Sequence, residues 1–482
     1  MFFNSIDFAI FLPIVFFIYW FIGSKNLKLQ NCLIVVASYL FYGWWDWRFL
    51  ILIFFSTVID YSVGDSLSKQ NNPVKRKILL WISVVVNLGF LGVFKYYNFF
   101  IENFTDLFSL FGTEIKTKSL EFILPVGISF YTFQTLSYTI DVYNRKLKAS
   151  QDFIAFMAFV SFFPQLVAGP IERAKNLLPQ FYSNRSFKYS SGVDGMRQIL
   201  WGLFKKIVIA DNCAEYANLF FNNSEIYSGS ALLLGAIFFT FQIYGDFSGY
   251  SDIAIGSSRL FGFNLKQNFA FPYFSRDIAE FWRKWHISLS TWFRDYLYIP
   301  LGGSRGGKWS KVRNTFLIFI VSGFWHGANW TFIAWGILNA FYILPLLLTN
   351  NNRNNLETIA KGKIIPTLKE FFLILFTFGL TIFAWIFFRA ESISHAFSYI
   401  SRIFSSSIVN IPEFPEELKA LKLIFIIVIF LLIEWMGREN HFAIEKFGLK
   451  WSKTVRWGFY FLIISSLFLF TGKEQQFIYF QF

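Results

Sequence analysis

The chain has 482 residues, of which 55% are apolar, 22% aromatic and only 15% charged, with a net charge of +14 and a mean hydropathy of +0.45. Several soluble domains are excluded, because no linkers or amphipathic periods separate the apolar runs. Nucleic-acid binding is disfavoured, since the basic residues lie in short loops and form no basic face. The composition predicts an integral membrane protein.

Apolar runs recur from one end of the chain to the other, many of them near the roughly 20 residues that cross about 30 Å of hydrocarbon. In chain order they are residues 8–22, 32–42, 49–63, 78–94, 122–140, 153–168, 196–210, 231–244, 315–348, 371–388, 421–435 and 455–470. Gly, Pro and polar residues interrupt several of them, so some segments enter the membrane without crossing it. We expect an all-α, polytopic protein with one domain over residues 1–482, about eleven transmembrane helices, and re-entrant and interfacial helices.

Loop charges predict the orientation, because cytoplasmic loops carry the excess of Lys and Arg. The connection 68–77 holds four basic residues and no acid, whereas 98–121 holds four acids and two lysines. We expect the first connection and Lys25 and Lys28 on the cytoplasmic side of the plasma (inner) membrane, and the N-terminus outside. The first run lacks a basic n-region and a cleavage pattern, so we expect it to be retained.

The cysteines and histidines show no spacing that would suit a metal or a disulfide. Cys32 and Cys213 are far apart, and the four histidines are scattered. We therefore expect neither a structural disulfide nor a bound metal. His395 and His441 lie at span ends beside charged residues, where we expect them at the membrane interface.

Two carboxylates, Asp246 and Asp252, lie among small and aromatic residues next to the run 231–244. They could orient a histidine or neutralise Arg259. Equally, the glycines at 245, 249 and 256 could let helices pack closely while nearby hydroxyls satisfy the carboxylates.

Residues 275–299 keep the apolar period of one amphipathic helix, with Ser275 as a plausible N-cap. His286 falls on the apolar face of this helix. A polar ring on that face needs a partner. The alternative is a helix that lies in the membrane interface.

The Gly-rich, basic loop that follows imitates two motifs of soluble enzymes. Residues 302–306 fit G-x-S-x-G but follow no strand, as a nucleophile elbow must. Trp309 stands where a P-loop requires Ser or Thr. Arg305, Lys308 and Arg313 could still contact the phosphates of a donor such as coenzyme A. The alternative is an ordinary cytoplasmic loop.

His326 is isolated within a long apolar stretch. No Lys, Arg, Asp or Glu occurs between Arg313 and Arg353. An ionisable residue at membrane depth is costly and suggests a functional site, and burial favours the neutral imidazole that a general base needs. The alternative is a structural histidine bonded to Asn329 or to a neighbouring helix.

Five segments resemble the membrane-bound O-acyltransferases, and among them the bacterial branch typified by alginate O-acetyltransferase. They are FWRKWHISLSTWFRDYLYIPLGGSR (281–305), SGFWHGANWTFIAWG (322–336), SFYTFQTLSYTIDVY (129–143), PQLVAGPIER (164–173) and YGDFSGYSDIAIG (244–256). The resemblance runs nearly end to end. It implies a helical fold around a central tunnel, with catalytic histidines at His326 and His286.

The resemblance also implies O-acetylation of an extracytoplasmic polysaccharide, with acetyl-CoA as donor substrate and no bound cofactor. We expect His326 to accept the hydroxyl proton, while His286 or Asn329 stabilises the oxyanion. A periplasmic or extracellular SGNH-type partner is expected to pass the acetyl group to the polymer. Peptidoglycan O-acetylation and a teichoic-acid D-alanylation type of transfer stay open. A transporter or flippase and a scaffolding membrane subunit are the alternatives of another class.

Overall fold

The computed structural model describes residues 1–23, 26–112, 120, 125, 127–167, 169–472 and 475–478. All regular elements in these ranges are helices. Position 25, most of the predicted 98–121 connection beyond residue 112, the start of the 122–140 run and residue 168 lie outside the described residues. Six helices are long and apolar enough to cross a membrane, namely Phe49–Lys69, Pro73–Leu110, Gly229–Leu260, Trp330–Leu348, Leu368–Arg389 and Glu417–Gly437. The predicted all-α membrane architecture is confirmed.

Contacts divide the chain into two compact units. Unit 1 comprises Met1–Val193 and Ser257–Lys266, and unit 2 comprises Asp194–Gly256 and Gln267–Phe482. Two helices, α10 (Tyr189–Leu203) and α12 (Gly229–Leu260), contribute residues to both units. The single domain expected from the sequence stays a prediction.

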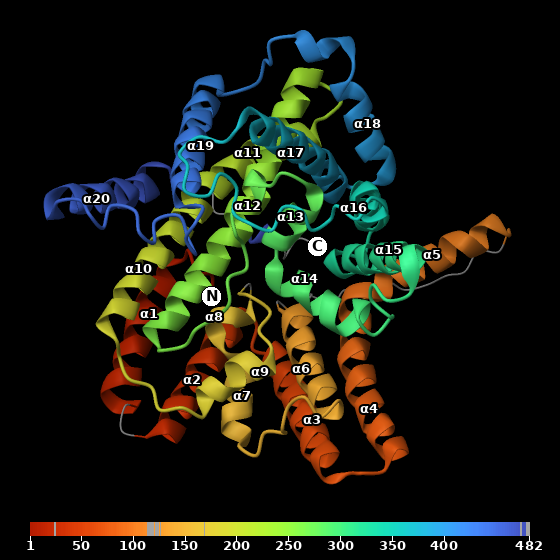
Figure 1. Cartoon of the computed structure of the whole chain (residues 1–482), viewed down its shortest axis with the longest axis vertical. Coiled ribbons are helices and arrows are strands. Elements are labelled where there is room, and N and C mark those ends of the chain that lie inside the picture. The colour runs from red at the N-terminus through yellow and green to blue at the C-terminus, as the bar shows by residue number, and fades with distance from the viewer. Residues whose placement is uncertain are drawn as a thin grey trace. The chain divides into compact units, whose positions relative to one another are not determined.

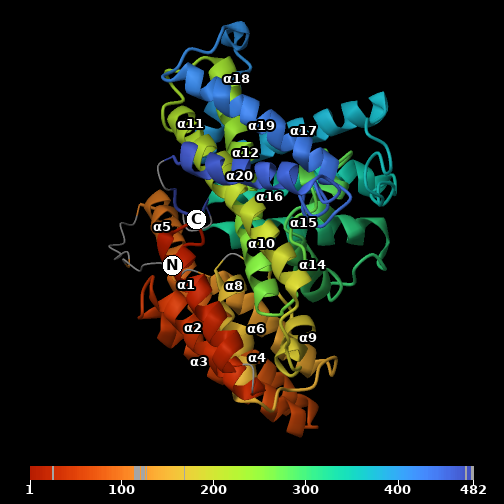
Figure 2. The same ribbon diagram turned by 90° about the vertical axis from the view of Figure 1, so that its left-hand side faces the viewer.

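Unit 1 is an assembly of helices around the buried helix α6. Its elements are α1 (Ile6–Phe17), η1 (Ile18–Ile22), α2 (Leu27–Gly43), α3 (Phe49–Lys69), α4 (Pro73–Leu91), η3 (Gly92–Tyr96), α5 (Tyr97–Leu110), α6 (Ile128–Tyr143), α7 (Phe153–Ser161), α8 (Phe163–Leu166), α9 (Ala174–Leu177) and η4 (Leu178–Phe181). Helices α3, α4 and α6 pack against one another, and α3 also lies beside α2 (Figures 1 and 2).

A buried carboxylate joins three of these helices. Asp60 of α3 accepts hydrogen bonds from Asn87 of α4 at 2.9 Å and from Thr139 of α6 at 3.0 Å. It also accepts a hydrogen bond from the hydroxyl of Ser83. Side-chain bonds of this kind hold apolar helices together where lipid provides no hydrophobic driving force.

Unit 2 contains the segments that carry both candidate histidines. Besides α10 and α12, its elements are η5 (Phe204–Ala210), α11 (Asp211–Asn222), η6 (Pro272–Phe274), α13 (Ile278–Lys284), α14 (Ile287–Phe293), η7 (Arg294–Tyr298), α15 (Gly307–His326), α16 (Trp330–Leu348), α17 (Leu368–Arg389), α18 (Ile393–Ile403), η8 (Ser406–Val409), α19 (Glu417–Gly437) and α20 (Lys453–Leu469). Helix α16 lies beside both α15 and α17 (Figures 1 and 2).

Among the described residues, six helices rather than about eleven are long and apolar enough to cross a membrane, because several predicted spans are interrupted and others, such as Ile6–Ile22 and Leu27–Gly43, are shorter. The run 153–168 folds as α7 and α8, with Pro164 in the first turn of α8. The run 196–210 is completed by the π-helix η5. The run 315–348 splits after His326 into α15 and α16. These interruptions leave irregular backbone that protein, not lipid, must surround.

Candidate active site

The predicted amphipathic helix 275–299 is broken at His286. Helix α13 ends at Lys284 and α14 begins at Ile287, and between them His286 has left-handed backbone angles of φ 43° and ψ 55°. Few residues other than glycine take this conformation, although histidine takes it more often than branched residues do. The prediction of one continuous helix was therefore wrong, because periodicity does not reveal a single left-handed residue.

The N-cap of this segment also differs from the prediction. The carboxylate of Asp277 accepts the Glu280 backbone N–H at 2.7 Å and so caps α13. The Ser275 hydroxyl instead donates to the Pro272 carbonyl at 2.6 Å. Both residue types favour N-caps, and the η6 turn shifts the start of the helix by two residues.

His286 is enclosed within the protein and has a polar partner. Only 1% of the residue is exposed, and its Nδ1 lies 3.1 Å from Oδ1 of Asn268. The edge of Phe247 meets the ring, with centroids 4.6 Å apart. Burial lowers the pKa of the imidazole to about 3, so the ring is neutral at physiological pH. The predicted need for a partner is confirmed.

His326 is the last residue of α15 and lies among aromatic rings. Its ring centroid is 5.1 Å from that of Trp335 and 5.2 Å from that of Phe388, and 4% of the residue is exposed. Trp335 belongs to α16 and Phe388 to α17, so three helices enclose the imidazole.

Glycine allows α15 and α16 to approach closely beside His326. A Cβ atom on Gly323 would lie 2.2 Å from the backbone oxygen of Phe332, and one on Gly336 would lie 2.2 Å from that of Phe319. Close contact through glycine is a recurrent way of packing membrane helices. It places Trp335 against the His326 ring.

One cavity in unit 2, of about 270 Å³, brings the two histidines together. Its lining includes aromatic, polar and basic side chains, among them Trp282, Trp285, His286, Phe293, Phe319, Ser322, His326, Arg283, Arg294 and Arg353. A neutral imidazole can take a proton from a bound hydroxyl. The cavity opens to the surface at Arg294, Ser304 and Arg353, whereas both imidazoles are buried. The arrangement suits proton transfer from a substrate that reaches the histidines through this opening.

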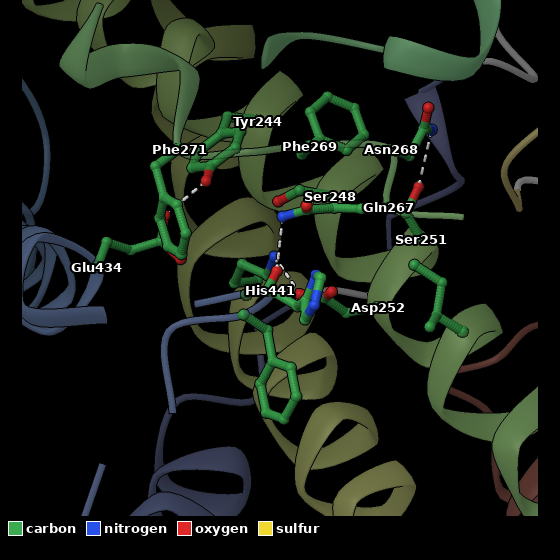
Figure 3. A pocket seen from close by; sticks show the side chains of 13 residues that line it. Tyr244, Ser248, Ser251, Asp252, Gln267, Asn268, Phe269, Phe271, Glu434 and His441 are labelled. Carbon is green, nitrogen blue, oxygen red and sulfur yellow. Dashed lines mark hydrogen bonds and ion pairs between the residues drawn. The ribbon is translucent and has the colours of Figure 1, made fainter. Parts of the chain in front are cut away.

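Asp246 and Asp252 both pair with lysines. The Asp252 carboxylate lies 2.5 Å from Lys205 Nζ, in the pocket shown in Figure 3. Asp246 lies 2.8 Å from Lys206 Nζ. The close-packing interpretation of this helix is supported by its glycines, since a Cβ on Gly249 would lie 2.8 Å from a backbone oxygen of α10. The carboxylates, however, are balanced by cations rather than by hydroxyls alone.

Asn329 caps a helix and is not among the residues that line the cavity. Its Oδ1 accepts the Thr331 N–H at 3.0 Å, and its Nδ2 donates to the Glu391 carbonyl at 3.0 Å. These bonds use the amide to begin α16. The alternative of a bond between Asn329 and His326, and the oxyanion role of Asn329, stay predictions.

The basic loop contributes Ser304 to the lining of the cavity, but its basic side chains lie elsewhere. Arg305, Lys308 and Arg313 are all exposed, and none of them lines the cavity. Arg313 instead donates to the amide oxygen of Asn314 at 3.0 Å. The basic residues in the lining are Arg283, Arg294 and Arg353, which loop composition could not single out.

The remaining histidines and the cysteines are away from this cavity. His395 lies 3.3 Å from the Ser224 hydroxyl, His441 is exposed, and Cys32 and Cys213 are free thiols. Within the described part of the chain, no group of three or more His, Cys, Asp or Glu residues could hold a metal ion.

Comparisons with known proteins identify the family. The sequence model of the membrane-bound O-acyltransferase family matches residues 45–388. A probable alginate O-acetylase of Pseudomonas putida is 36% identical over 99% of both chains. The peptidoglycan O-acetyltransferase of Helicobacter pylori is 31% identical over 98% of this chain and 95% of its own. A teichoic acid D-alanyltransferase of Streptococcus thermophilus is 30% identical over 55% of this chain and 67% of its own.

Proposed function

The chain belongs to the membrane-bound O-acyltransferase family and is an acyltransferase, and we propose that it moves an acetyl group from a cytosolic thioester onto an extracytoplasmic polysaccharide. The observation that carries the proposal is the cavity that both His286 and His326 line. Two buried imidazoles that line one cavity suit proton transfer between an alcohol and a thiolate.

The reaction needs no covalent enzyme intermediate. The hydroxyl oxygen of the acceptor attacks the thioester carbonyl carbon while His326 takes the hydroxyl proton. The C–S bond then breaks, the thiolate leaves, and the proton passes to its sulfur. The products are an acetyl ester and a free thiol.

Acetyl-CoA is the proposed donor substrate, and no bound cofactor is required. Support comes from Arg283, Arg294 and Arg353 in the same lining, because guanidinium groups bind phosphates well. The exposed Arg305, Lys308 and Arg313 are less suitable, since they lie outside the lining.

The acceptor is proposed to be a polysaccharide, because relatives named as probable alginate O-acetylases match at 36–38% identity over 91% or more of this chain. Peptidoglycan O-acetylation is the second candidate, favoured by the relative of that name. A periplasmic or extracellular SGNH-type partner would receive the acetyl group and pass it to the polymer.

The protein is a multi-pass membrane protein, and the charge of its loops supports a place in the plasma (inner) membrane with the N-terminus outside. Single cysteines introduced near residue 72 and near residue 5 would test this orientation. A membrane-impermeant maleimide added to intact cells should label the second position and spare the first.

The test of the proposed function uses the purified protein in proteoliposomes, together with its SGNH-type partner, radiolabelled acetyl-CoA and oligosaccharides of mannuronate, glucose or N-acetylglucosamine. Acetyl-ester formation should fall by about 100- to 10,000-fold in His326→Ala, the range for loss of a general base. His395→Ala is the matched control, because this histidine is outside the cavity lining, and its activity should stay within twofold. Undiminished ester formation in His326→Ala would overturn the mechanism. Movement of label across the membrane without any ester would indicate a transporter instead.

A further inference from the structure

Asn268 is the meeting point of several hydrogen bonds around His286. It is fully buried, and its Oδ1 lies 3.1 Å from His286 Nδ1, 3.2 Å from the Ser288 backbone N and 2.9 Å from the Ser288 hydroxyl. On its other side, Asn268 Nδ2 lies 3.2 Å from the Ser251 hydroxyl (Figure 3). Both the oxygen and the nitrogen of this side-chain amide therefore have hydrogen-bond partners.

The orientation of this amide follows from the chemistry of its neighbours. A backbone N–H can only donate, so the Asn268 atom that faces Ser288 N has to be the oxygen. The amide nitrogen then points to Ser251, where a hydroxyl can accept. This argument fixes the assignment of oxygen and nitrogen, which coordinates alone do not distinguish.

The tautomer of His286 follows in turn. Asn268 Oδ1, which faces Nδ1, is an acceptor, and the Ser288 hydroxyl 3.4 Å from Nδ1 already donates to that oxygen, so Nδ1 carries the proton in the neutral ring. The lone pair is then on Nε2. We propose that Asn268 is a positioning residue that holds His286 in the Nδ1–H tautomer, so that Nε2 acts as a hydrogen-bond acceptor, and not as a donor, where His286 lines the cavity. The inference rests on the proposed function, and it removes the neutral His286 as an oxyanion donor.

The main chain of Asn268 supports the same geometry. Its carbonyl accepts the Ile287 N–H at 2.9 Å, and two residues later the Ala270 N–H donates to the Lys284 carbonyl at 3.0 Å. These bonds flank the left-handed residue His286. Such backbone conformations persist only where the surroundings hold them. Asn268 therefore fixes both the break between α13 and α14 and the direction of the ring.

Three variants and two readouts test this inference. In the protein labelled with 15N-histidine, which has four histidines, the His286 signals should show a protonated Nδ1 and an unprotonated Nε2. Asn268→Asp keeps an acceptor for all three donors and should keep that pattern. Asn268→Ala should lose it and lower kcat by about 10- to 100-fold, as removal of a residue that orients a histidine does in metal sites. Ser251→Ala, the matched control, should keep the tautomer.

The pH dependence of kcat provides a further test, because it should change only if Asn268 acts on the protonation of His286 and not if it merely supports the fold. A carboxylate facing Nδ1–H favours the protonated ring, so the acidic limb of the kcat profile should move to higher pH in Asn268→Asp. A protonated Nε2 in the unchanged protein, or an unshifted limb in an active Asn268→Asp, would overturn the inference. If the unchanged protein transfers no acetyl group, the proposed function fails, while the NMR result still decides the tautomer.

A second and independent observation concerns the oxyanion donor. The indole Nε1 of Trp282 is buried and has no acceptor among the described residues, and Trp282 lines the cavity with both histidines. Phe319 and Trp335 hold its ring, with centroids 5.3 and 5.5 Å away. We infer that this N–H donates to the thioester carbonyl oxygen, which becomes negative as the hydroxyl attacks.

Substitution by phenylalanine tests this role, because it keeps an aromatic ring and removes the donor. Trp282→Phe should lower kcat by about 100- to 1,000-fold, the loss seen on removing one oxyanion donor, and leave KM for acetyl-CoA within about threefold. Trp309→Phe is the control, since Trp309 is 81% exposed. A kcat within twofold of the unchanged protein in a folded Trp282→Phe would overturn the assignment.

Discussion

The two histidines of the cavity are held by opposite kinds of surroundings. His326 ends a helix and is enclosed by the rings of Trp335 and Phe388. His286 occupies a left-handed break and is held by the amide of Asn268. The first is fixed by shape and the second by hydrogen bonds. This difference predicts that stability around His286 falls when a buried charge is removed or the pH is lowered. Stability around His326 should fall when a larger side chain is introduced between the packed helices.

The largest effect on stability is expected at the buried ion pair between Asp252 and Lys205, which lies in the same pocket as Asn268. The Asp252 carboxylate lies 2.5 Å from Lys205 Nζ and accepts a hydrogen bond from Gln198 Nε2 at 2.7 Å. Ser251 and Asn268 line the same pocket. Asp252→Asn removes the carboxylate that pairs with the buried lysine and leaves only Glu434, which lines the same pocket, to balance its charge. The variant should lower the free energy of unfolding by about 3 kcal/mol. Denaturant titration in detergent measures it.

An exposed pair is the control for this prediction. Asp295 lies 2.7 Å from Arg294 Nε at the surface. Asp295→Asn should change stability by at most about 1 kcal/mol. Equal losses in the two variants would show that burial of the Asp252 pair is not what matters.

Acid should lower the free energy of unfolding, because the buried His286 ring resists protonation in the folded protein. Its pKa is about 3 in the folded protein, against 6.5 for the free side chain. Between these values the unfolded chain binds more protons, so stability falls as pH falls, by about 1.4 kcal/mol per pH unit. From pH 6 to pH 4 the unchanged protein should lose roughly 2–3 kcal/mol more than His286→Gln does. Parallel pH dependences of the two proteins would contradict a neutral, buried ring.

The smallest effect concerns packing beside His326. A Cβ on Gly323 would lie 2.2 Å from the Phe332 backbone oxygen, so Gly323→Ala should separate α15 from α16 at a cost of about 1–3 kcal/mol. Gly379→Ala in α17 is the control, since no atom lies within 4 Å of the Cβ it would add. Thermal unfolding compares them. A fully stable Gly323→Ala would mean that the two helices can shift without loss.

The contrast between the two sides also explains what the sequence could predict. His326 could be identified from its isolation among apolar residues, because burying an ionisable group is costly wherever it occurs. The all-α membrane fold followed from the apolar runs for the same general reason. Both inferences need only local sequence.

The support of His286 could not be predicted in this way. Asn268 precedes it by 18 residues, and its contact depends on the left-handed break, which the helical period concealed. Likewise Lys205 and Lys206, the partners of Asp252 and Asp246, come from η5. The arginines of the cavity lining could not be singled out from the sequence, because basic residues recur in all cytoplasmic loops and only the fold shows which of them line the cavity.

The central claim is that the two histidines act on one acyl transfer, and a double-mutant cycle tests it most directly. The kcat of acetyl-ester formation is measured in proteoliposomes for His286→Gln, His326→Gln and the double variant. Groups that act as a unit lose activity non-additively, so the double variant should be no slower than the slower single variant. A double variant whose loss equals the product of the two single losses would contradict the account.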